Sequence, residues 1–115
     1  MSAAKNNFVI EKWASFKSKL TYRTGSGRAV NLSFCTAKLQ LRASLTSEVL
    51  FELSTTNGRI KPLSQNGVIE FLVSAADTGA IVFTNAVYDL VVTFADGTKI
   101  RLLEGKFTVV DGVTR

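Results

Sequence analysis

The chain has 115 residues, of which 46% are hydrophobic and 20% are charged, and its formal net charge is +5. A chain of this length and composition forms one folded domain, and no apolar run approaches the ~20 residues needed to cross a bilayer. We therefore expect a single domain over residues 1–115, with flexible polar ends at about 1–7 and 111–115 and no membrane partner.

The residue types that build common catalytic sites are missing or scattered. The sequence contains no histidine, which removes the usual general base and the Ser-His-Asp and Cys-His arrangements. The carboxylates lack the spacing of a paired acid and base or of a metal site. The single cysteine, Cys35, is expected to be a small buried side chain. We predict a protein that is not an enzyme and has no catalytic residues, cofactor or metal.

The basic residues are spread along the chain. Lys17, Lys19 and Arg23 fall on one predicted strand face, and Lys38 and Arg42 fall on another, with Thr, Ser and Gln between them. No pattern of alternating basic and aromatic residues of the kind that binds single-stranded nucleic acid is present. We therefore expect solvated strand faces and no specific nucleic-acid partner.

Taken in chain order, a short apolar patch at residues 8–10 is followed by a series of half-buried strands. Alternation of apolar and polar side chains predicts these strands over residues 14–22, 37–43, 49–53 and 68–73. Lys38 and Arg42 are expected to face Glu48 and Glu52 across a hairpin. Ser74 as a cap and Gly79 as a stop predict one helical turn over residues 74–80.

The chain closes with a predicted hairpin. Tyr88, Leu90, Val92 and Phe94 fall on every second residue, and Asp96-Gly97 then predicts a tight two-residue turn. Alternation resumes over residues 99–103, is interrupted at Gly105, and leads into a last strand over residues 107–110. We expect the glycine to kink this final strand.

Short alternating strands separated by Gly and Asn turns predict an all-β fold. Our first choice is an antiparallel immunoglobulin-like β-sandwich with one short helical turn. A small closed β-barrel is the alternative.

The same closing hairpin carries a family resemblance. Val87-Tyr88-Asp89-Leu90, Asp96-Gly97, Arg101-Leu102-Leu103-Glu104-Gly105-Lys106 and Val113-Thr114-Arg115 occur in the order seen in a family of small tailed-bacteriophage virion proteins. The chain is also similar to the amino-terminal domain of phage baseplate upper proteins. Blocks over residues 8–16, 36–42 and 67–79 extend the resemblance over nearly the whole chain. It departs from the usual family pattern at Lys12-Trp13, where a glycine is commoner, and at Phe34-Cys35, where Thr-Gly is typical.

The resemblance implies an immunoglobulin-like module with a structural role in the virion, near the tail, baseplate or tail fibres. The chain is then synthesised in the host bacterial cytoplasm, and other phage virion proteins are its partners, with multiple copies in a symmetric assembly. The first alternative is capsid decoration, in which copies stabilise the head. The second is a carbohydrate- or receptor-binding module with Trp13 as a stacking platform.

Roles for individual residues follow from their chemistry. The ring of Tyr88 is expected to pack in the core while its hydroxyl finds a backbone partner. Arg101 is expected to pair with Asp89 on the adjacent strand. We expect the motif residues as a group to serve folding, and we take Phe8 and Trp13 as candidate interface residues.

Overall fold

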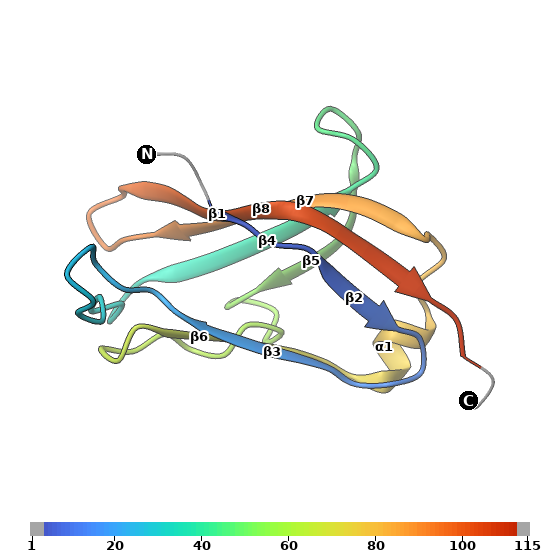
Figure 1. Ribbon diagram of the computed structural model, residues 1–115, viewed down its shortest axis with the longest axis horizontal. Coiled ribbons are helices and arrows are strands. Elements are labelled where there is room, and N and C mark those ends of the chain that lie inside the picture. Colours follow the sequence, from blue (N-terminus) through green and yellow to red (C-terminus); the bar gives the residue numbers. More distant parts are fainter. Residues whose placement is uncertain (1–3, 113–115) are drawn as a thin grey trace.

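The computed structural model describes residues 4–112, which form two facing layers of strands (Figure 1). The elements are β1 (Ala4–Lys5), β2 (Phe8–Glu11), β3 (Phe16–Thr21), β4 (Thr36–Arg42), β5 (Val49–Ser54), β6 (Val68–Val73), α1 (Ala75–Gly79), β7 (Asn85–Thr93) and β8 (Lys99–Val110). The described part measures 44 × 27 × 24 Å along its principal axes. The predicted all-β fold with one short helical turn is confirmed.

The strands form two separate sheets. The larger sheet has the order β1-β8-β7-β4-β5, with β2 also on the outer side of β8, and the smaller sheet consists of β3 and β6. β1 and β2 run parallel to β8, whereas the other neighbours are antiparallel. Because the described strands lie in two open sheets, the alternative of a closed barrel is wrong.

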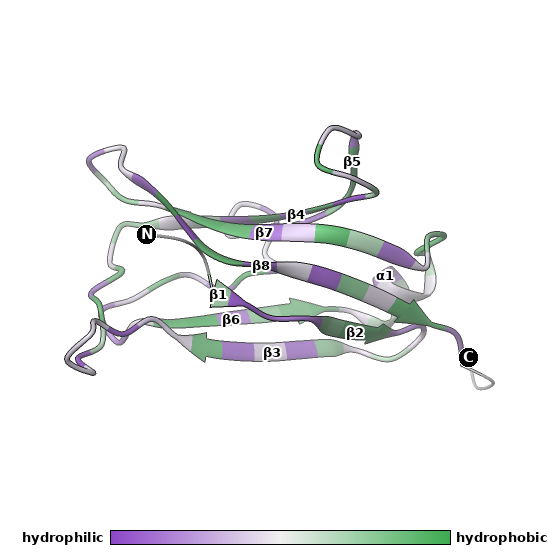
Figure 2. Cartoon of the chain, turned by 45° about the horizontal axis from the view of Figure 1, so that its top comes forward, coloured by the Kyte–Doolittle hydropathy of each residue, from purple (hydrophilic) through white to green (hydrophobic). Residues whose placement is uncertain are grey.

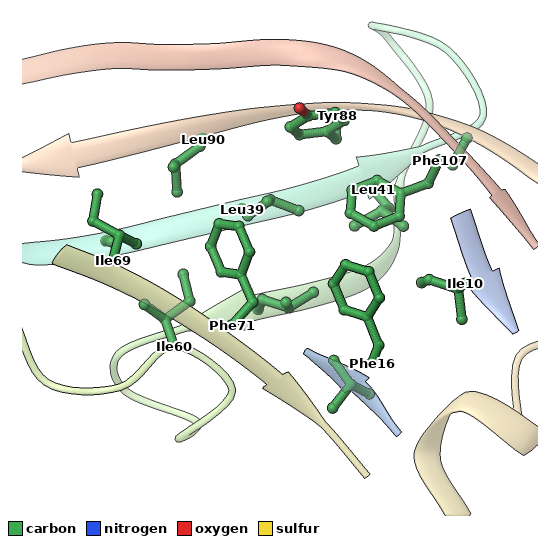
Figure 3. Packing of buried hydrophobic residues seen from close by; sticks show 14 of the residues in the cluster. Ile10, Phe16, Leu39, Leu41, Ile60, Ile69, Phe71, Tyr88, Leu90 and Phe107 are labelled. Carbon is green, nitrogen blue, oxygen red and sulfur yellow. The ribbon is translucent and has the colours of Figure 1, made fainter. Parts of the chain in front are cut away.

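The core lies between the two sheets and follows from the alternation of side chains. Figure 2 shows apolar and polar residues alternating along the strands, as expected when one face of each strand is buried. Ile69 and Phe71 of β6 point toward Leu39, Leu41 and Leu90 of the larger sheet (Figure 3). Burying each such side chain contributes about 1.5–3 kcal/mol, which makes this interlayer contact the main source of stability.

A cluster of aromatic rings fills one part of this core. The ring of Phe8 lies 5.0 Å from that of Phe107, 5.6 Å from Tyr88, 5.9 Å from Phe16 and 6.2 Å from Phe71. Such pairs contribute about 0.5–1.5 kcal/mol each beyond the area that they bury. Phe8, which we took as a candidate interface residue, is half-buried and packs its ring against the core. Its position next to β8 brings the apolar patch at 8–10 into the sandwich.

The amino-terminal strands β1 and β2 pair with β8 along the outer edge of the larger sheet. β1 and β2 keep one register on β8 and are separated by Asn6 and Asn7. Asn6 N–H donates to Glu104 O (3.0 Å), and the side-chain oxygen of Asn7 accepts from Lys106 N–H (3.0 Å). Residues 4–7 thus differ from the flexible end that we expected, while residues 1–3 lie outside the described residues. At the carboxyl-terminal end, residues 111–112 follow β8, and residues 113–115 lie outside the described residues.

Tyr88 fixes this edge from inside the core. It is 5% exposed, and its hydroxyl donates to Asn6 O at 2.7 Å, which confirms the buried ring and the backbone partner that we expected. Gly105 lies opposite Tyr88 in the register, and a Cβ there would collide with the main-chain oxygen of Asn6. Glycine therefore interrupts the alternation at residue 105 because the backbones of β8 and Asn6 approach each other closely there.

The turn between β7 and β8 has three residues rather than the expected two. Phe94 N–H donates to Thr98 O (2.8 Å) and Gly97 N–H donates to Phe94 O (2.9 Å). A two-residue type I′ turn needs a left-handed backbone at both central residues. Here Gly97 has a φ of 92°, whereas Asp96 instead accepts Thr98 N–H through its side chain (2.9 Å). Asp96 and Gly97 thus shape the turn as expected, but its loop is one residue longer than predicted.

We predict that Tyr88→Phe lowers the free energy of unfolding by about 1–3 kcal/mol, because Asn6 O loses its donor inside the protein. Urea unfolding at pH 7, followed by tryptophan fluorescence, measures the loss. Equal stability of the variant and the parent would contradict the role of this hydrogen bond.

The same variant tests a pH dependence. Burial raises the pKa of Tyr88 to about 12, whereas an unperturbed tyrosine ionises near pH 10. The stability that comes from burying the neutral phenol is therefore present below about pH 10 and is lost as the pH rises toward 12. The gap in stability between parent and Tyr88→Phe should shrink over that window. A gap that stays constant would count against burial of the neutral form.

Candidate interaction surfaces

The motif residues of the closing hairpin divide between the core and the outer face of the larger sheet. Leu90 is buried, and Leu102 and Leu103 are half-buried. On the outer face, Arg101 Nε donates to Asp89 Oδ2 at 2.9 Å, which confirms the expected pair. Exposed ion pairs of this kind add about 0–1 kcal/mol, so the pair favours the register of β7 and β8 more than it adds stability. Val113, Thr114 and Arg115 lie outside the described residues.

This outer face also carries a shallow hollow of about 830 Å³. Its charged and polar lining includes Lys5, Gln40, Arg42, Arg101, Glu104 and Lys106. The expected pairing of Lys38 and Arg42 with Glu48 and Glu52 is not the one formed. Glu52 accepts from Gln40 Nε2 (2.9 Å), while Arg42 donates to Gln40 Oε1 (2.9 Å) and to Ser47 O. Within the lining of the hollow, Arg42 bonds Gln40 and Arg101 bonds Asp89, while apolar groups of Leu45, Val87 and Tyr88 make up much of the remaining surface.

Trp13, which we took as a candidate interface residue and stacking platform, lies in the turn between β2 and β3. Its indole covers Gly79 of α1 so closely that a Cβ at Gly79 would collide with the ring. The same turn is held at Ala14 O, which accepts from Thr78 Oγ1 at 2.9 Å. Trp13 is 39% exposed and has a φ of 67°. Gly79 is therefore a packing site for the indole, and Trp13 has a partner within its own chain.

Phe34 is the exposed aromatic residue that our sequence reasoning did not select. It lies directly before Cys35 and β4, has a φ of 64° and is 90% exposed. An L-residue in this left-handed region costs about 1–2 kcal/mol. Within residues 4–112, Trp13 and Phe34 are the non-glycine residues with positive φ. Trp13 lies in a dipeptide where a glycine is commoner in the resembled family, but at Phe34-Cys35 the family's glycine stands at the second position, so the sequence gives no signal for the backbone of Phe34.

A second, smaller hollow lies between β5 and the connection from α1 to β7. We call it the β5 cleft; it has a volume of about 200 Å³ and is lined by Leu50, Phe51, Arg59, Asp77, Ala80, Ile81, Val82 and Phe83. Most of these side chains are apolar. Val82 is 96% exposed and Leu50 is 40% exposed, so apolar groups stand at the mouth of the cleft.

Arg59 holds one wall of the β5 cleft in place. Its guanidinium pairs with Asp77 Oδ2 (3.0 Å), donates to Glu52 O (2.9 Å) and lies 4.3 Å from the centroid of the Phe51 ring. Leu72 N–H also donates to Arg59 O (2.8 Å). Because one side chain connects β5 to α1 and its backbone bonds β6, the cleft has a fixed shape. No sequence pattern predicts this arrangement, because its residues come from separate segments of the chain.

The pKa values of Cys35 and Asp96 are shifted by their surroundings. Cys35 is buried as expected, and burial, with a smaller effect from the charge of Asp96, raises the pKa of its thiol. Hydrogen bonds from Thr98 lower the pKa of Asp96. The described residues contain no group of three or more His, Cys, Asp or Glu that could hold a metal ion. Within residues 4–112, no helix is long and apolar enough to span a membrane.

Comparison with known proteins extends the description of the fold. No protein-family model and no curated protein matches the chain. Seventy-six chains of solved structures do match. One is the extracellular domain of the voltage-gated sodium channel beta4 subunit, whose parallel homodimer explains its role in cell-cell adhesion. It is 15% identical, has a TM-score of 0.52, and the match covers 98% of this chain and 97% of that one.

At this identity the likeness concerns the fold alone. Together with the two-sheet order and the helical turn before β7, it shows that the chain is an immunoglobulin-like β-sandwich. The immunoglobulin-like arrangement that we predicted from the sequence is confirmed.

We predict that Trp13→Ala and Trp13→Gly both destabilise the protein, because each removes the indole from Gly79. The glycine variant should be the more stable of the two by about 1 kcal/mol, because alanine keeps the unfavourable left-handed backbone and glycine does not. Urea unfolding of the two variants side by side provides the comparison. An alanine variant as stable as the glycine variant would show that no strain is stored at this turn.

Proposed function

We propose that this chain is a non-enzymatic assembly module of a tailed-bacteriophage particle, associated with the tail, baseplate or tail fibres. The phage assignment rests on the resemblance of the closing hairpin and the blocks before it. The assembly role is carried by one observation, the exposed ring of Phe34 on a left-handed backbone. In the isolated chain the exposed apolar ring and the left-handed backbone of Phe34 are both unfavourable. Backbone outliers of this kind are typical of functional positions.

The surroundings of Phe34 support docking onto another protein. Its exposed ring is of the aromatic type that is enriched at the centre of protein interfaces. Exposed charged and polar residues surround it in the sequence: Arg28 and Asn31 precede it, and Thr36 follows. A polar rim around an aromatic anchor is the usual anatomy of an interface that forms between separately folded proteins.

The solved relative supports the same class of role. In the sodium channel beta4 subunit an immunoglobulin-like domain forms a homodimer that serves adhesion. A fold of this kind presents two sheet faces and two sets of loops without needing a catalytic centre. For this chain the proposed partners are other virion proteins and further copies of itself, and the proposed location is the virion after synthesis in the host cytoplasm.

A cryo-electron microscopy map of purified particles that encode this chain tests the proposal. We expect density for the sandwich at the tail, baseplate or fibres, in a copy number set by the symmetry of that organelle. Copies spread over the head lattice would support capsid decoration instead. Absence of the chain from purified particles, checked by mass spectrometry, would overturn the proposed function.

A further inference from the structure

β3 is an edge strand whose outer side is open. The smaller sheet consists of β3 and β6, and no described strand lies beyond β3 (Figure 2). On the far side of β6, Glu70 O and Leu72 N–H bond the segment 59–61 (3.0 and 2.8 Å), so these two residues turn their backbone groups away from β3. Lys19 and Lys17 are level with them. Because opposite residues of an antiparallel pair share one orientation, the N–H and C=O groups of Lys17 and Lys19 point out of the open edge.

The other strand edges of the described sandwich are closed or broken. At β5, Glu52 O accepts from the side chains of Asn57 (3.0 Å) and Arg59 (2.9 Å). At the opposite edge of the larger sheet, β1 and β2 have two and four residues and are separated by residues 6–7. β3 offers six consecutive residues without a break. An open edge of this kind accepts an extended peptide as an additional strand.

β3 lies opposite the amino-terminal strands of the larger sheet. The ring of Phe16 in β3 is 5.9 Å from that of Phe8 in β2 and 5.8 Å from that of Phe107 in β8. β6 instead faces the middle of the larger sheet, since Phe71 points toward Leu39 of β4 (Figure 3). Because neighbouring strands lie about 4.7–4.9 Å apart, a strand added to β3 would extend the smaller sheet across the inner face of β1 and β2.

The core is less completely covered on this side. Ile69 of β6 is buried, whereas Leu20, level with it on β3, is half-buried. In the larger sheet Leu90 is buried, Leu103 beside it is half-buried, and Ala4 beside Leu103 is exposed. The exposure of inward side chains thus rises in both sheets toward the edges formed by β3 and β1. An additional strand with apolar side chains facing inward would remove this surface from water.

The outer face of the β3 edge is positively charged. Lys17 and Lys19 are exposed, and within residues 4–112 neither forms an ion pair, whereas Glu70 opposite Lys19 pairs with Lys61 (3.5 Å). A second copy that added its own β3 would bring the lysines of both copies onto one face, and like charges opposite each other are destabilising. No described strand of this chain has acidic residues at alternate positions. The charges therefore favour a different protein as the source of the added strand.

We infer that the open edge of β3 binds an extended segment of another protein in which apolar residues alternate with Asp or Glu. This inference rests on the proposed assembly role and specifies the chemistry of the partner. The backbone of the segment bonds the outward groups of Lys17, Lys19 and Thr21. Its apolar side chains cover Leu20 and Leu103, and its carboxylates lie beside the two lysines.

A synthetic peptide tests this inference with the intact chain. The probe is a labelled peptide, blocked at both ends, in which glutamate and valine alternate over the length of β3, and its counterpart has lysine in place of glutamate. Fluorescence anisotropy should show saturable binding of the acidic peptide, weakened at high salt, and no binding of the basic one. Amide exchange followed by NMR should slow by about tenfold or more at Lys17, Lys19 and Thr21 when the acidic peptide is bound. Attraction to the lysine side chains alone would leave these amides unchanged.

Variants separate the charge from the backbone. Lys17→Glu combined with Lys19→Glu should weaken binding of the acidic peptide by about tenfold or more and create binding of the basic peptide. Lys38→Glu combined with Lys99→Glu makes the same change in net charge at exposed strand residues of the larger sheet and should bind like the parent. Lys19→Pro removes an outward N–H without breaking a bond to β6, so it should fold but not bind.

A parent that does not bind the acidic peptide, or that binds it without slower exchange at the three amides, would overturn the inference. Equal loss of binding in the two glutamate pairs would overturn it as well, and these surface variants decide the matter even if Lys19→Pro fails to fold. The proposed function is tested separately. If the chain is found in particles with the β3 edge uncovered, the inference fails and the function stands. If the peptide binds as described but the chain is absent from particles, the proposed function fails and the inference stands.

Discussion

The hydrogen bond from the Tyr88 hydroxyl to Asn6 O ties the outer edge of the larger sheet to the core. It connects the middle of β7 to the break between β1 and β2, and the absence of a side chain at Gly105 lets the two backbones meet there. With that edge in place, Phe8 enters the aromatic cluster and bridges rings from both sheets. Without it, β8 would have an unpaired outer edge, and the core would be open on that side.

Two aromatic residues have the same unfavourable backbone conformation but differ in what offsets its cost. The indole of Trp13 packs on Gly79, and the neighbouring Ala14 O bonds Thr78, so contacts within the chain compensate for its left-handed φ. Phe34 has the same backbone, but its ring is almost fully exposed to solvent. No comparable packing offsets the cost of its backbone within the described residues. This contrast separates a residue that serves the fold from one that we assign to assembly.

Alternation of side chains was sufficient to predict β3, β4, β6 and β7 and the roles of Tyr88 and of the Asp89–Arg101 pair, and the capping residues Ser74 and Gly79 predicted the helical turn. Each of these features depends on neighbours in sequence or on one hairpin. The pairing of β1 with β8 was not predictable, since it joins residues about a hundred positions apart and gives no local pattern. The β5 cleft was missed for the same reason. Phe34 was missed as well, because a positive φ and an exposed ring in the connection before β4 follow no local sequence pattern.

The parallel pairing of β2 with β8 has a consequence for folding during synthesis. Phe8 through Glu11 bond residues 107–110, so β2 cannot pair with β8 until about a hundred further residues have been made. Contacts between such distant residues make the formation of this edge slow compared with the folding of helical proteins of similar size.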